Sequence, residues 1–383
     1  MVLLIILFLA AAFHVFSSQH FEFTPPLIRP WRNIYKQNLC VDVTQEMRNG
    51  KWRPRRDLQP EGELHRREQD IRIRKLRGLP IKLYSEDMRC GNKFAINAPA
   101  FGPKIPALCD PNSTAPCCNH EIGRCGSGEK NCSCNRCTDF RNTVTAELNE
   151  FVPTSGCQFK NFTTEQVCQL LSERLSSLTL IGDLLVRHLN NALMILFTND
   201  RETGCLNIHI NKTHRRLCSG DMHFVDGGKT TCNGKTARNI DQLPKGKFCQ
   251  GKYNFQYAYH VFYNLAKAKL ALDKVREHFH KKNSVVAIGT GLHIGLNAEK
   301  VFNGYLKPIL QLKERAKSNW PLIVWLTTHA QGSMKPIPYR QSQNNEKISL
   351  FNTKMSAFLE PIRVPVFDTF NLTLGVHSYD GTH

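Results

Sequence analysis

The stretch "SLTLIGDLLVRH", from Ser177 to His188, points most directly to the fold of this chain. Its first half is a short, continuous apolar run that ends at Gly182 and Asp183, and its second half is amphipathic. Glycine permits a tight turn and aspartate caps a following helix, so the stretch predicts a buried strand that leads directly into a helix. A nucleophile at such a helix start would lie beside backbone N–H groups that can hold an oxyanion. The next residue is Leu184, however, and leucine cannot act as a nucleophile.

Similar apolar runs recur along the second half of the chain and alternate with helical stretches. The strand-like runs are "SLTLIG", "SVVAIGTG", "PLIVWLTT" and "RVPVFDTF", and the helical stretches are "LLVRHLNNALMILF", "NAEKVFNGYLKPILQLKERAK" and "NEKISLFNTKMSAFLE". This alternation predicts an α/β domain over residues 156–383 with a parallel sheet covered on both faces. In open sheets of this kind, ligands bind at the carboxyl ends of the strands.

A segment between Cys205 and Cys249 interrupts the alternation. It is irregular and contains four cysteines with many Gly, Lys and His residues. We interpret it as a disulfide-braced insertion at the edge of the sheet, with metal binding by its histidines as the weaker alternative. For the chain as a whole we expect no metal and no cofactor.

The first 18 residues, "MVLLIILFLAAAFHVFSS", form one uncharged apolar run that ends in small residues. This is the shape of a signal peptide, although no basic segment precedes the run. The run is also about the shortest that spans a bilayer, so an uncleaved membrane anchor is the alternative, and cleavage is favoured. The chain is therefore expected to be secreted and extracellular, or to lie in the Golgi or ER lumen if the segment stays as an anchor.

Cysteines and glycosylation sequons agree with that compartment. Fifteen cysteines in an otherwise ordinary composition favour disulfides in an oxidising environment. Their odd number leaves at least one thiol unpaired or bonded to another chain. Asn-x-Ser/Thr sequons that could carry glycans lie at Asn112, Asn161, Asn211 and Asn371, and a fifth at Asn131 is disfavoured by its middle cysteine.

Residues 19–89 are rich in Pro and Arg and predict an extended or loosely helical arm. Between Arg48 and Arg77, eleven Lys and Arg stand against five Asp and Glu, within a formal charge of +19 for the whole chain. In an exported protein such a basic arm favours anionic glycans or anionic membrane surfaces as partners. A solvated linker is an equally good interpretation. No base-reading motif accompanies the charge, so we expect no nucleic-acid partner.

A cysteine-dense module occupies residues 90–140. Eight cysteines from Cys90 to Cys137 leave too little room for an apolar core, so disulfides must supply the rigidity. Zinc is the competing interpretation because of the Cys134-x-x-Cys137 spacing. The adjacent cysteines 117 and 118 and the export signal make zinc the weaker choice.

The order of these cysteines resembles hevein-type chitin-binding modules. The resemblance implies three disulfides: Cys90 with Cys118, Cys109 with Cys125, and Cys117 with Cys132. Hevein-type modules hold sugars with aromatic rings after the double cysteine, whereas the matching stretch here is "NHEIGR". The scaffold is therefore expected without its usual sugar site.

The last residues of the sequence, "SYDGTH", place Asp380 three residues before His383. This spacing lets a carboxylate orient the imidazole of a general base. Alone, such a pair is more often an ordinary loop contact. Together with a strand-Gly-Asp turn in the same α/β domain, it indicates a hydrolase-like site.

Three blocks in the region from 156 to 383 resemble the SGNH hydrolases of the PC-esterase branch, which includes plant trichome-birefringence-like and animal NXPE proteins. The blocks are "GDLLVRH", "IGTGLH" and "SYDGTH", in the family's order. The resemblance implies a three-layer flavodoxin-like fold, preceded here by the small disulfide-rich module. It also implies acyl-ester chemistry on glycans, usually transfer or removal of O-acetyl groups.

The resemblance assigns roles to residues of this chain. His383 would be the base and Asp380 its orienting carboxylate, while Arg187 would support the turn or contact substrate. Gly291 and His293 would contact the oxyanion or substrate, although a strand-end glycine turn with a satisfied histidine is an equally good interpretation. The implied oxyanion- and substrate-binding set comprises Gly182, Asp183, Arg187, Gly291 and His293.

Leu184 departs from the family at its nucleophile position, which closes the route through a seryl acyl-enzyme. The nearby Ser176 and Ser177 precede the strand and are poor substitutes. Family members generally continue beyond the position of His383, which suggests a C-terminal truncation.

Three functions follow as hypotheses, and we favour the first. The chain is a secreted or lumenal SGNH-like glycoprotein that binds acylated or anionic glycans but has lost catalysis with its serine. Alternatively, it is an active carbohydrate esterase or O-acetyltransferase in which Asp380 and His383 activate water directly. The third hypothesis is an extracellular glycan-binding adhesion or matrix protein built around the cysteine module and the basic arm.

Overall fold

A computed structural model describes most of the α/β region and part of what precedes it. The described residues are 39–40, 42–56, 64, 68, 71, 114–115, 117–119, 124–127, 146, 148–224, 232, 234–332, 339 and 341–376. The apolar leader, most of the cysteine module and residues 377–383 lie outside the described residues. No helix in the described part of the chain is long and apolar enough to cross a membrane.

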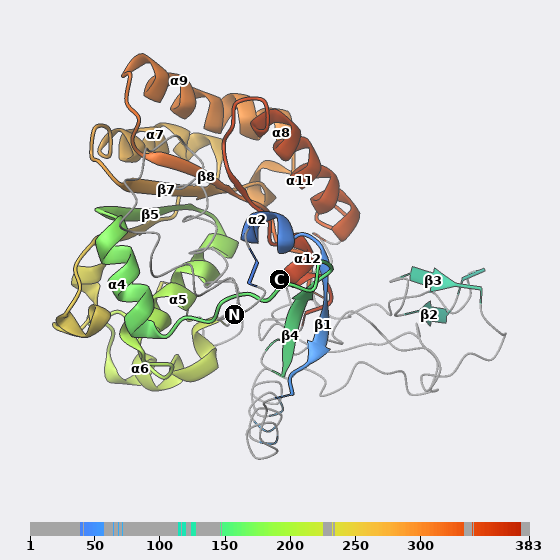
Figure 1. Cartoon of the computed structure of the whole chain (residues 1–383), viewed down its shortest axis with the longest axis horizontal. Coiled ribbons are helices and arrows are strands. Elements are labelled where there is room, and N and C mark those ends of the chain that lie inside the picture. The colour runs from blue at the N-terminus through green and yellow to red at the C-terminus, as the bar shows by residue number, and fades with distance from the viewer. Residues whose placement is uncertain are drawn as a thin grey trace.

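A five-stranded parallel sheet forms the centre of the molecule (Figure 1). Its strands are β5 (Ser177–Gly182), β6 (Gln256–His260), β7 (Ser284–Gly289), β8 (Leu322–Leu326) and β9 (Val366–Phe367). Their spatial order is β6-β5-β7-β8-β9, so the first strand along the chain lies between the second and the third. This is the doubly wound, flavodoxin-like order, and it confirms the predicted fold class.

Helices cover both faces of the sheet, as the continuous apolar strands predict (Figure 1). On one face lie α4 (Thr164–Arg174) and α5 (Leu184–Thr198), and on the other lie α7 (Ala268–Arg276), α8 (Ala298–Val301), α9 (Lys307–Arg315) and α11 (Asn345–Leu359). The long helix predicted from "NAEKVFNGYLKPILQLKERAK" is divided, because a π-helix, η9 (Phe302–Leu306), separates α8 from α9. All residues of β5, β7 and β8 are buried between the two helical layers.

The irregular segment between β5 and β6 covers the edge of the sheet at β6. It comprises α6 (Lys212–Leu217), η4 (Gly220–Phe224), η5 (Ile240–Gln242) and η6 (Phe248–Gly251). The amide of Tyr259 donates to the carbonyl of Arg238 at 2.7 Å, so the segment pairs with the exposed side of β6.

Disulfides brace this segment, which confirms the predicted insertion. Cys218–Cys232 closes it internally, and Cys168–Cys249 ties its end to α4. Cys205 forms no disulfide, and its side chain is fully buried. Its thiol is therefore one that stays unpaired, since no other chain can reach it in the folded protein.

Residues before the cysteine module also belong to the α/β domain. After α2 (Val43–Glu46), strand β1 (Gly50–Pro54) pairs antiparallel with β4 (Asn149–Pro153), and Cys40 is bonded to Cys157. Met47 and Phe151 are buried in the core that α4 and α5 share. The sequence placed the first of these elements in a basic arm, but the structure packs them against the sheet domain.

The cysteine module is thus inserted into a two-stranded ladder. Its chain leaves after β1 and returns before β4, where the amide of Arg55 donates to the carbonyl of Leu148 at 3.1 Å. Within the module, β2 (Cys117–Asn119) and β3 (Arg124–Gly126) form a short antiparallel pair.

Candidate functional site

The strand order defines one position where a ligand would bind. From β5 the chain passes to α5 on one face of the sheet, and from β7 it passes to η8 (Leu292–Ile294) and α8 on the other face. The carboxyl ends of β5 and β7 therefore form a topological switch point, where doubly wound proteins bind their ligands. Gly182 and Gly289 lie opposite each other in the ladder at this point. Two of the three predicted blocks, "GDLLVRH" and "IGTGLH", thus come together as expected.

Glycines at the switch point are required by close packing. A Cβ on Gly182 would lie 2.1 Å from the carbonyl oxygen of Gly289, and one on Gly291 would lie 2.7 Å from the ring of Phe351. Both distances are far below van der Waals contact, so a side chain at Gly182 would push the two strand ends apart, and one at Gly291 would displace Phe351 of α11. Gly291 therefore fits the structural interpretation that the sequence left open, whether or not its backbone also contacts a ligand.

Asp183 caps α5, as the sequence predicts. Its carboxylate accepts a hydrogen bond from the amide of Leu185 at 3.0 Å, and its side chain is buried. The backbone of Asp183 is held from both neighbouring strands. The amide of Asp183 donates to the carbonyl of Gly289 in β7, and the hydroxyl of Tyr259 in β6 donates to the carbonyl of Asp183 at 2.9 Å. The turn is therefore fixed in place before any ligand arrives.

Leu184 is the first residue of α5, and its side chain is half-buried at the turn. The first amides of a helix have no partner inside that helix, so a hydroxyl at this position would lie beside free donors. Leucine offers an apolar surface there instead.

Arg187 lies one turn further along α5 and is 5% exposed. Its Nη2 is 3.1 Å from Nε2 of His188, and the ring of His188 packs against Phe224 of the insertion. These contacts place the Arg187 side chain beside the insertion, and its two predicted roles, support of the turn and contact with a substrate, stay predictions.

His293, in contrast, is exposed. Its ring centre is 4.5 Å from that of Tyr263, which follows β6, and the two rings are tilted by 48°. The hydroxyl of Thr290 donates to the carbonyl of Tyr263 at 2.8 Å, so the loops after β6 and β7 are joined here. Tyr263 had no predicted role, although it follows a strand end as the other site residues do.

Tyr305, from the π-helix η9, fixes the loop after β6 by a hydrogen bond. Its hydroxyl donates to the carbonyl of Phe262 at 2.5 Å, and its side chain is fully buried. Burial raises the pKa of Tyr305, and the nearby charge of Asp183 raises it further. The phenol therefore stays protonated and acts as a hydrogen-bond donor.

Polar residues also follow β8, and the sequence reasoning missed them. The side chain of Asn352 makes two hydrogen bonds to the backbone of Thr328. Oδ1 of Asn352 accepts from the amide of Thr328, and Nδ2 of Asn352 donates to the carbonyl of Thr328. Thr327 donates to the carboxylate of Asp368 after β9, and His329 follows half-buried. The signal was present in "LIVWLTTH", a buried strand run followed directly by polar residues.

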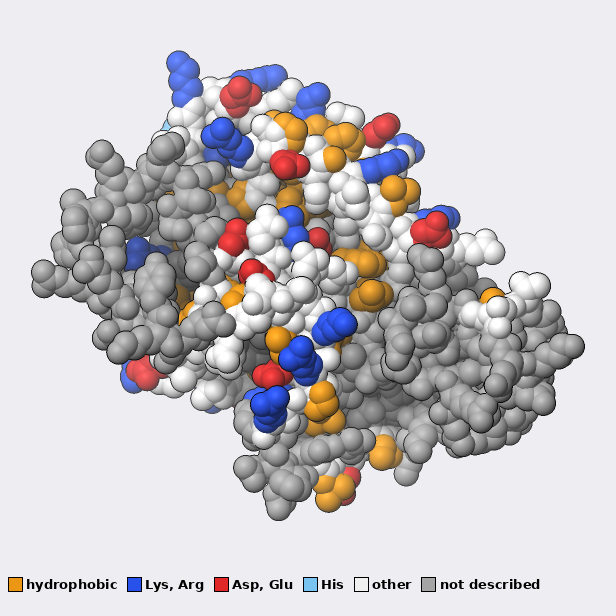
Figure 2. Space-filling view, turned by 45° about the vertical axis from the view of Figure 1, so that its right-hand side comes forward, with side chains coloured by type: hydrophobic (Ala, Val, Ile, Leu, Met, Phe, Trp, Pro, Cys, Tyr) orange, Lys and Arg blue, Asp and Glu red, His pale blue; other side chains and the backbone are white. Residues whose placement is uncertain are grey.

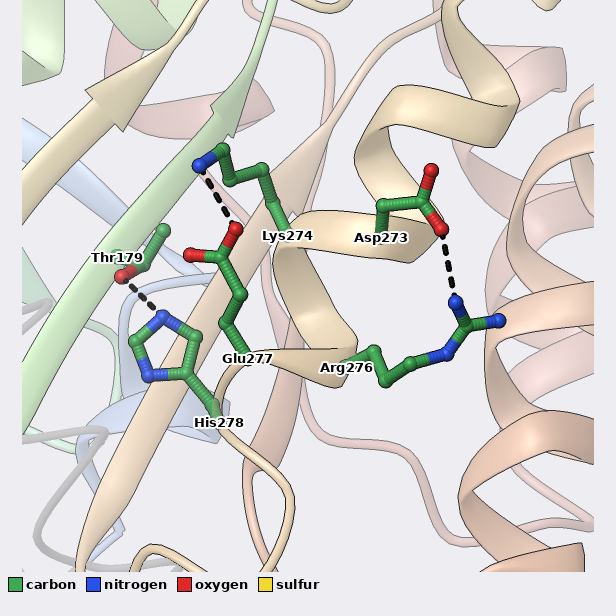
Figure 3. A network of polar contacts seen from close by, with 6 residues as sticks. All are labelled: Thr179, Asp273, Lys274, Arg276, Glu277 and His278. Carbon is green, nitrogen blue, oxygen red and sulfur yellow. Dashed lines mark hydrogen bonds and ion pairs between the residues drawn. The ribbon is translucent and has the colours of Figure 1, made fainter.

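A serine–histidine pair does exist, but at the opposite end of β5. The hydroxyl of Ser177 is 3.1 Å from Nδ1 of His278. On the other side of the ring, the hydroxyl of Thr179 is 3.0 Å from Nε2, and Figure 3 shows this second contact. Burial lowers the pKa of His278 to about 4, with the charge of Lys281 as the next cause. Ser177 is 1% exposed and lies roughly 17 Å along the strand from the switch point, so no substrate reaches this pair.

Several predicted residues fall outside the described part of the chain. They are Asp380 and His383, the sequon at Asn112, and Cys90, Cys109 and Cys132 of the implied hevein-type disulfides. Of the remaining cysteines of that set, only the backbone is described: 117 and 118 lie in β2, 125 lies in β3, and 118 is opposite 125. The three implied disulfides and the Asp-x-x-His block remain predictions.

The three described sequon asparagines are all exposed. Asn161 precedes α4, Asn211 caps α6 with its side-chain oxygen, and the side-chain amide of Asn371 donates to the carbonyl of Arg48. Glycosylation at these positions stays a prediction.

The strand order and the disulfides define a doubly wound α/β protein, which is consistent with an SGNH-like domain. Within the described residues, no three His, Cys, Asp or Glu side chains come together as a metal site. No family model matches this chain, and no curated protein matches it.

Proposed function

We propose that this chain is a secreted or lumenal glycoprotein of the SGNH type, PC-esterase branch, that binds acylated glycans at the β5/β7 crevice without cleaving them. One observation carries the proposal: the half-buried Leu184 stands at the start of α5, directly after the capping Asp183. The turn, the helix start and the opposing glycine loop support a ligand site, while the position for a nucleophile is apolar.

The chemistry that is lost can be stated in atoms. In a serine enzyme of this kind the hydroxyl oxygen bonds to the acyl carbon, a base accepts the hydroxyl proton, and the sugar oxygen leaves with a proton. Leucine can form no such bond. Amides at the helix start can still donate to an ester carbonyl, which would favour binding of an acylated sugar over an unsubstituted one.

The test compares wild type with Leu184→Ser and Leu184→Ala on p-nitrophenyl acetate and an acetylated xylo-oligosaccharide. We expect no turnover and no acetyl adduct by intact mass spectrometry for wild type and Leu184→Ala, and binding of the acetylated oligosaccharide by both. Leu184→Ser alone could form an adduct, because only it restores a hydroxyl. Hydrolysis by wild type that disappears in His383→Ala would instead establish the active esterase.

A second candidate function is adhesion to anionic glycans through the inserted residues 57–147. It is favoured because both ends of this insertion are fixed to the α/β domain. The contact between Arg55 and Leu148 brings the two ends together at a ladder fixed by the Cys40–Cys157 disulfide. Basic side chains on the face of the described domain shown in Figure 2 are interspersed with acidic ones, so that face offers no continuous basic band.

Replacing residues 57–147 by a short Gly-Ser linker tests this candidate on a heparin column. The cut must spare β1, because Met47 and the strand that follows it pack in the domain. Loss of most of the salt-resistant retention would favour adhesion through the insertion. Unchanged retention would assign anionic binding to the α/β domain.

A further inference from the structure

A pair of rings on the solvent side of the carboxyl edge lies beside the candidate crevice. Tyr263 is half-buried and His293 is exposed, and their ring centres are 4.5 Å apart. His293 follows Gly291 by two residues, so the pair adjoins the switch point. A second pair, His260 and Phe262, lies just before it in the chain, with nearly parallel rings 5.5 Å apart.

The backbone beneath Tyr263 is held at several points. Thr290 donates to the carbonyl of Tyr263, and the buried Tyr305 donates to the carbonyl of Phe262. Asn264 caps the short helix η7 (Leu265–Lys267) by accepting from the amide of Lys267 at 3.1 Å. A loop fixed in this way presents the half-buried ring of Tyr263 to a ligand at little entropic cost.

The geometry of the two rings favours one kind of ligand. Their centres are 4.5 Å apart, so the two rings contact each other and no planar aromatic ligand can lie between them. A pyranose ring fits better, since its apolar C–H face can lie on the tyrosine while a hydroxyl bonds to an imidazole nitrogen. Sites for small polar ligands combine an apolar surface with a few placed polar groups in this way.

We propose that Tyr263 and His293 form a sugar subsite that holds one pyranose ring of a glycan chain next to the β5/β7 crevice. This rests on the proposed function and extends it by naming the side chains that contact the sugar. Neither residue supplies chemistry to an acyl group. The subsite determines instead which glycan is held and how the chain runs across the carboxyl edge.

The experiment measures binding of three probes to the full chain by calorimetry: chitohexaose, an acetylated xylo-oligosaccharide and a heparin octasaccharide. For the probe that wild type binds, Tyr263→Ala is expected to raise Kd about tenfold, because a stacking surface is lost. Tyr263→Phe is expected to stay within about twofold of wild type, since the ring remains. His293→Ala is expected to raise Kd about threefold through loss of one hydrogen bond.

Two matched controls separate contact from unfolding. Tyr253→Ala removes a half-buried tyrosine that packs on the core of α4 and α5, and His209→Ala removes an exposed histidine of the insertion. Both should bind the probe as wild type does, with Tm recorded for every variant. If wild type binds and folded Tyr263→Ala binds equally well, the subsite is wrong and the proposed function stands. If wild type binds none of the probes, both proposals fall.

Discussion

The two ends of strand β5 differ in the side chains that they carry and in how far those side chains are buried. At the amino end, Ser177 and His278 supply a hydroxyl and an imidazole within hydrogen-bond distance, but both side chains are buried. At the carboxyl end, the turn at Asp183 offers a capped helix start at the switch point, but the side chain there is Leu184. The reactive groups at the amino end are therefore structural, whereas the helix start at the carboxyl end carries an aliphatic side chain in place of a hydroxyl.

The difference follows from how a parallel sheet is built. At the amino end, helix α7 and the turn after it close over the strand, and the polar groups satisfy one another. At the carboxyl end, the connections from β5 and β7 diverge to opposite faces of the sheet, and doubly wound proteins bind their ligands at such a switch point. A close serine–histidine distance is therefore weak support for catalysis until exposure is known.

The largest expected effect is at the carboxyl end, for Gly182→Ala. Its new Cβ would meet the carbonyl oxygen of Gly289, which is backbone and cannot swing away. We expect a loss of about 3 kcal/mol in the free energy of unfolding, or roughly 6 to 12 °C in Tm by calorimetry. Gly126→Ala is the matched control, because a Cβ there meets nothing within 4 Å. Equal Tm values for the two variants would contradict the packing of this turn.

Removing the imidazole at the amino end should have a smaller effect. His278→Ala leaves the hydroxyls of Ser177 and Thr179 buried without their partner, which is expected to cost roughly 2 kcal/mol. Urea unfolding monitored by fluorescence measures the change. His209→Ala, on an exposed histidine, should change stability by less than about 0.5 kcal/mol. If His278→Ala changed the free energy of unfolding as little as His209→Ala does, the hydrogen bonds from His278 to Ser177 and Thr179 would not stabilise the fold.

Acid should weaken the amino end selectively. Burial lowers the pKa of His278 to about 4, whereas the unfolded chain binds its proton near pH 6.5. Stability from the neutral imidazole is therefore complete above pH 6.5 and is lost as the pH falls towards 4, on the order of 1 to 3 kcal/mol. His223, buried in the insertion, has its pKa lowered to about 4 for the same reason and adds to the loss.

His278→Gln isolates the contribution of this one imidazole, because glutamine can still donate and accept but does not titrate. Between pH 6.5 and 4, its free energy of unfolding should fall less steeply than that of wild type. Parallel curves for the two proteins would show that His278 is not held neutral.

The smallest effect should come from Leu184→Ser. The side chain is only half-buried, so its truncation should cost about 1 kcal/mol or less in urea unfolding. Its neighbour Leu185 is 5% exposed, and Leu185→Ser should cost about 3 kcal/mol. If the two costs are equal, Leu184 is a core residue, and its position does not face the crevice.

The sequence predicted four of the five sheet strands. Three of them, β5, β7 and β8, are fully buried and read as continuous apolar runs, and the fourth, β9, is a two-residue strand within "RVPVFDTF". It missed β6, in which buried and exposed residues alternate because the insertion covers only its outer edge. It also missed β1, whose charged "GKWRP" pairs with a strand about a hundred residues later. No local pattern records a partner at that distance.

For the site, Gly182, Asp183 and Gly291 could be predicted because turns and caps constrain nearby residue types. Tyr263 and Tyr305 could not, since their positions depend on the loop after β6 meeting a π-helix from elsewhere in the chain. The exposure of His293 likewise depends on how these distant segments pack together.

By itself the sequence determined a cysteine-rich α/β chain in which leucine follows the strand turn, because apolar periodicity, cysteine content and residue identity are local properties. Only the tertiary structure decided that the two glycine loops meet, that Ser177 and His278 pair out of reach, and that β1 belongs to the sheet domain. The exposure of a side chain and its distance from another depend on packing between segments that are far apart in the sequence, and no local pattern of residues encodes that packing.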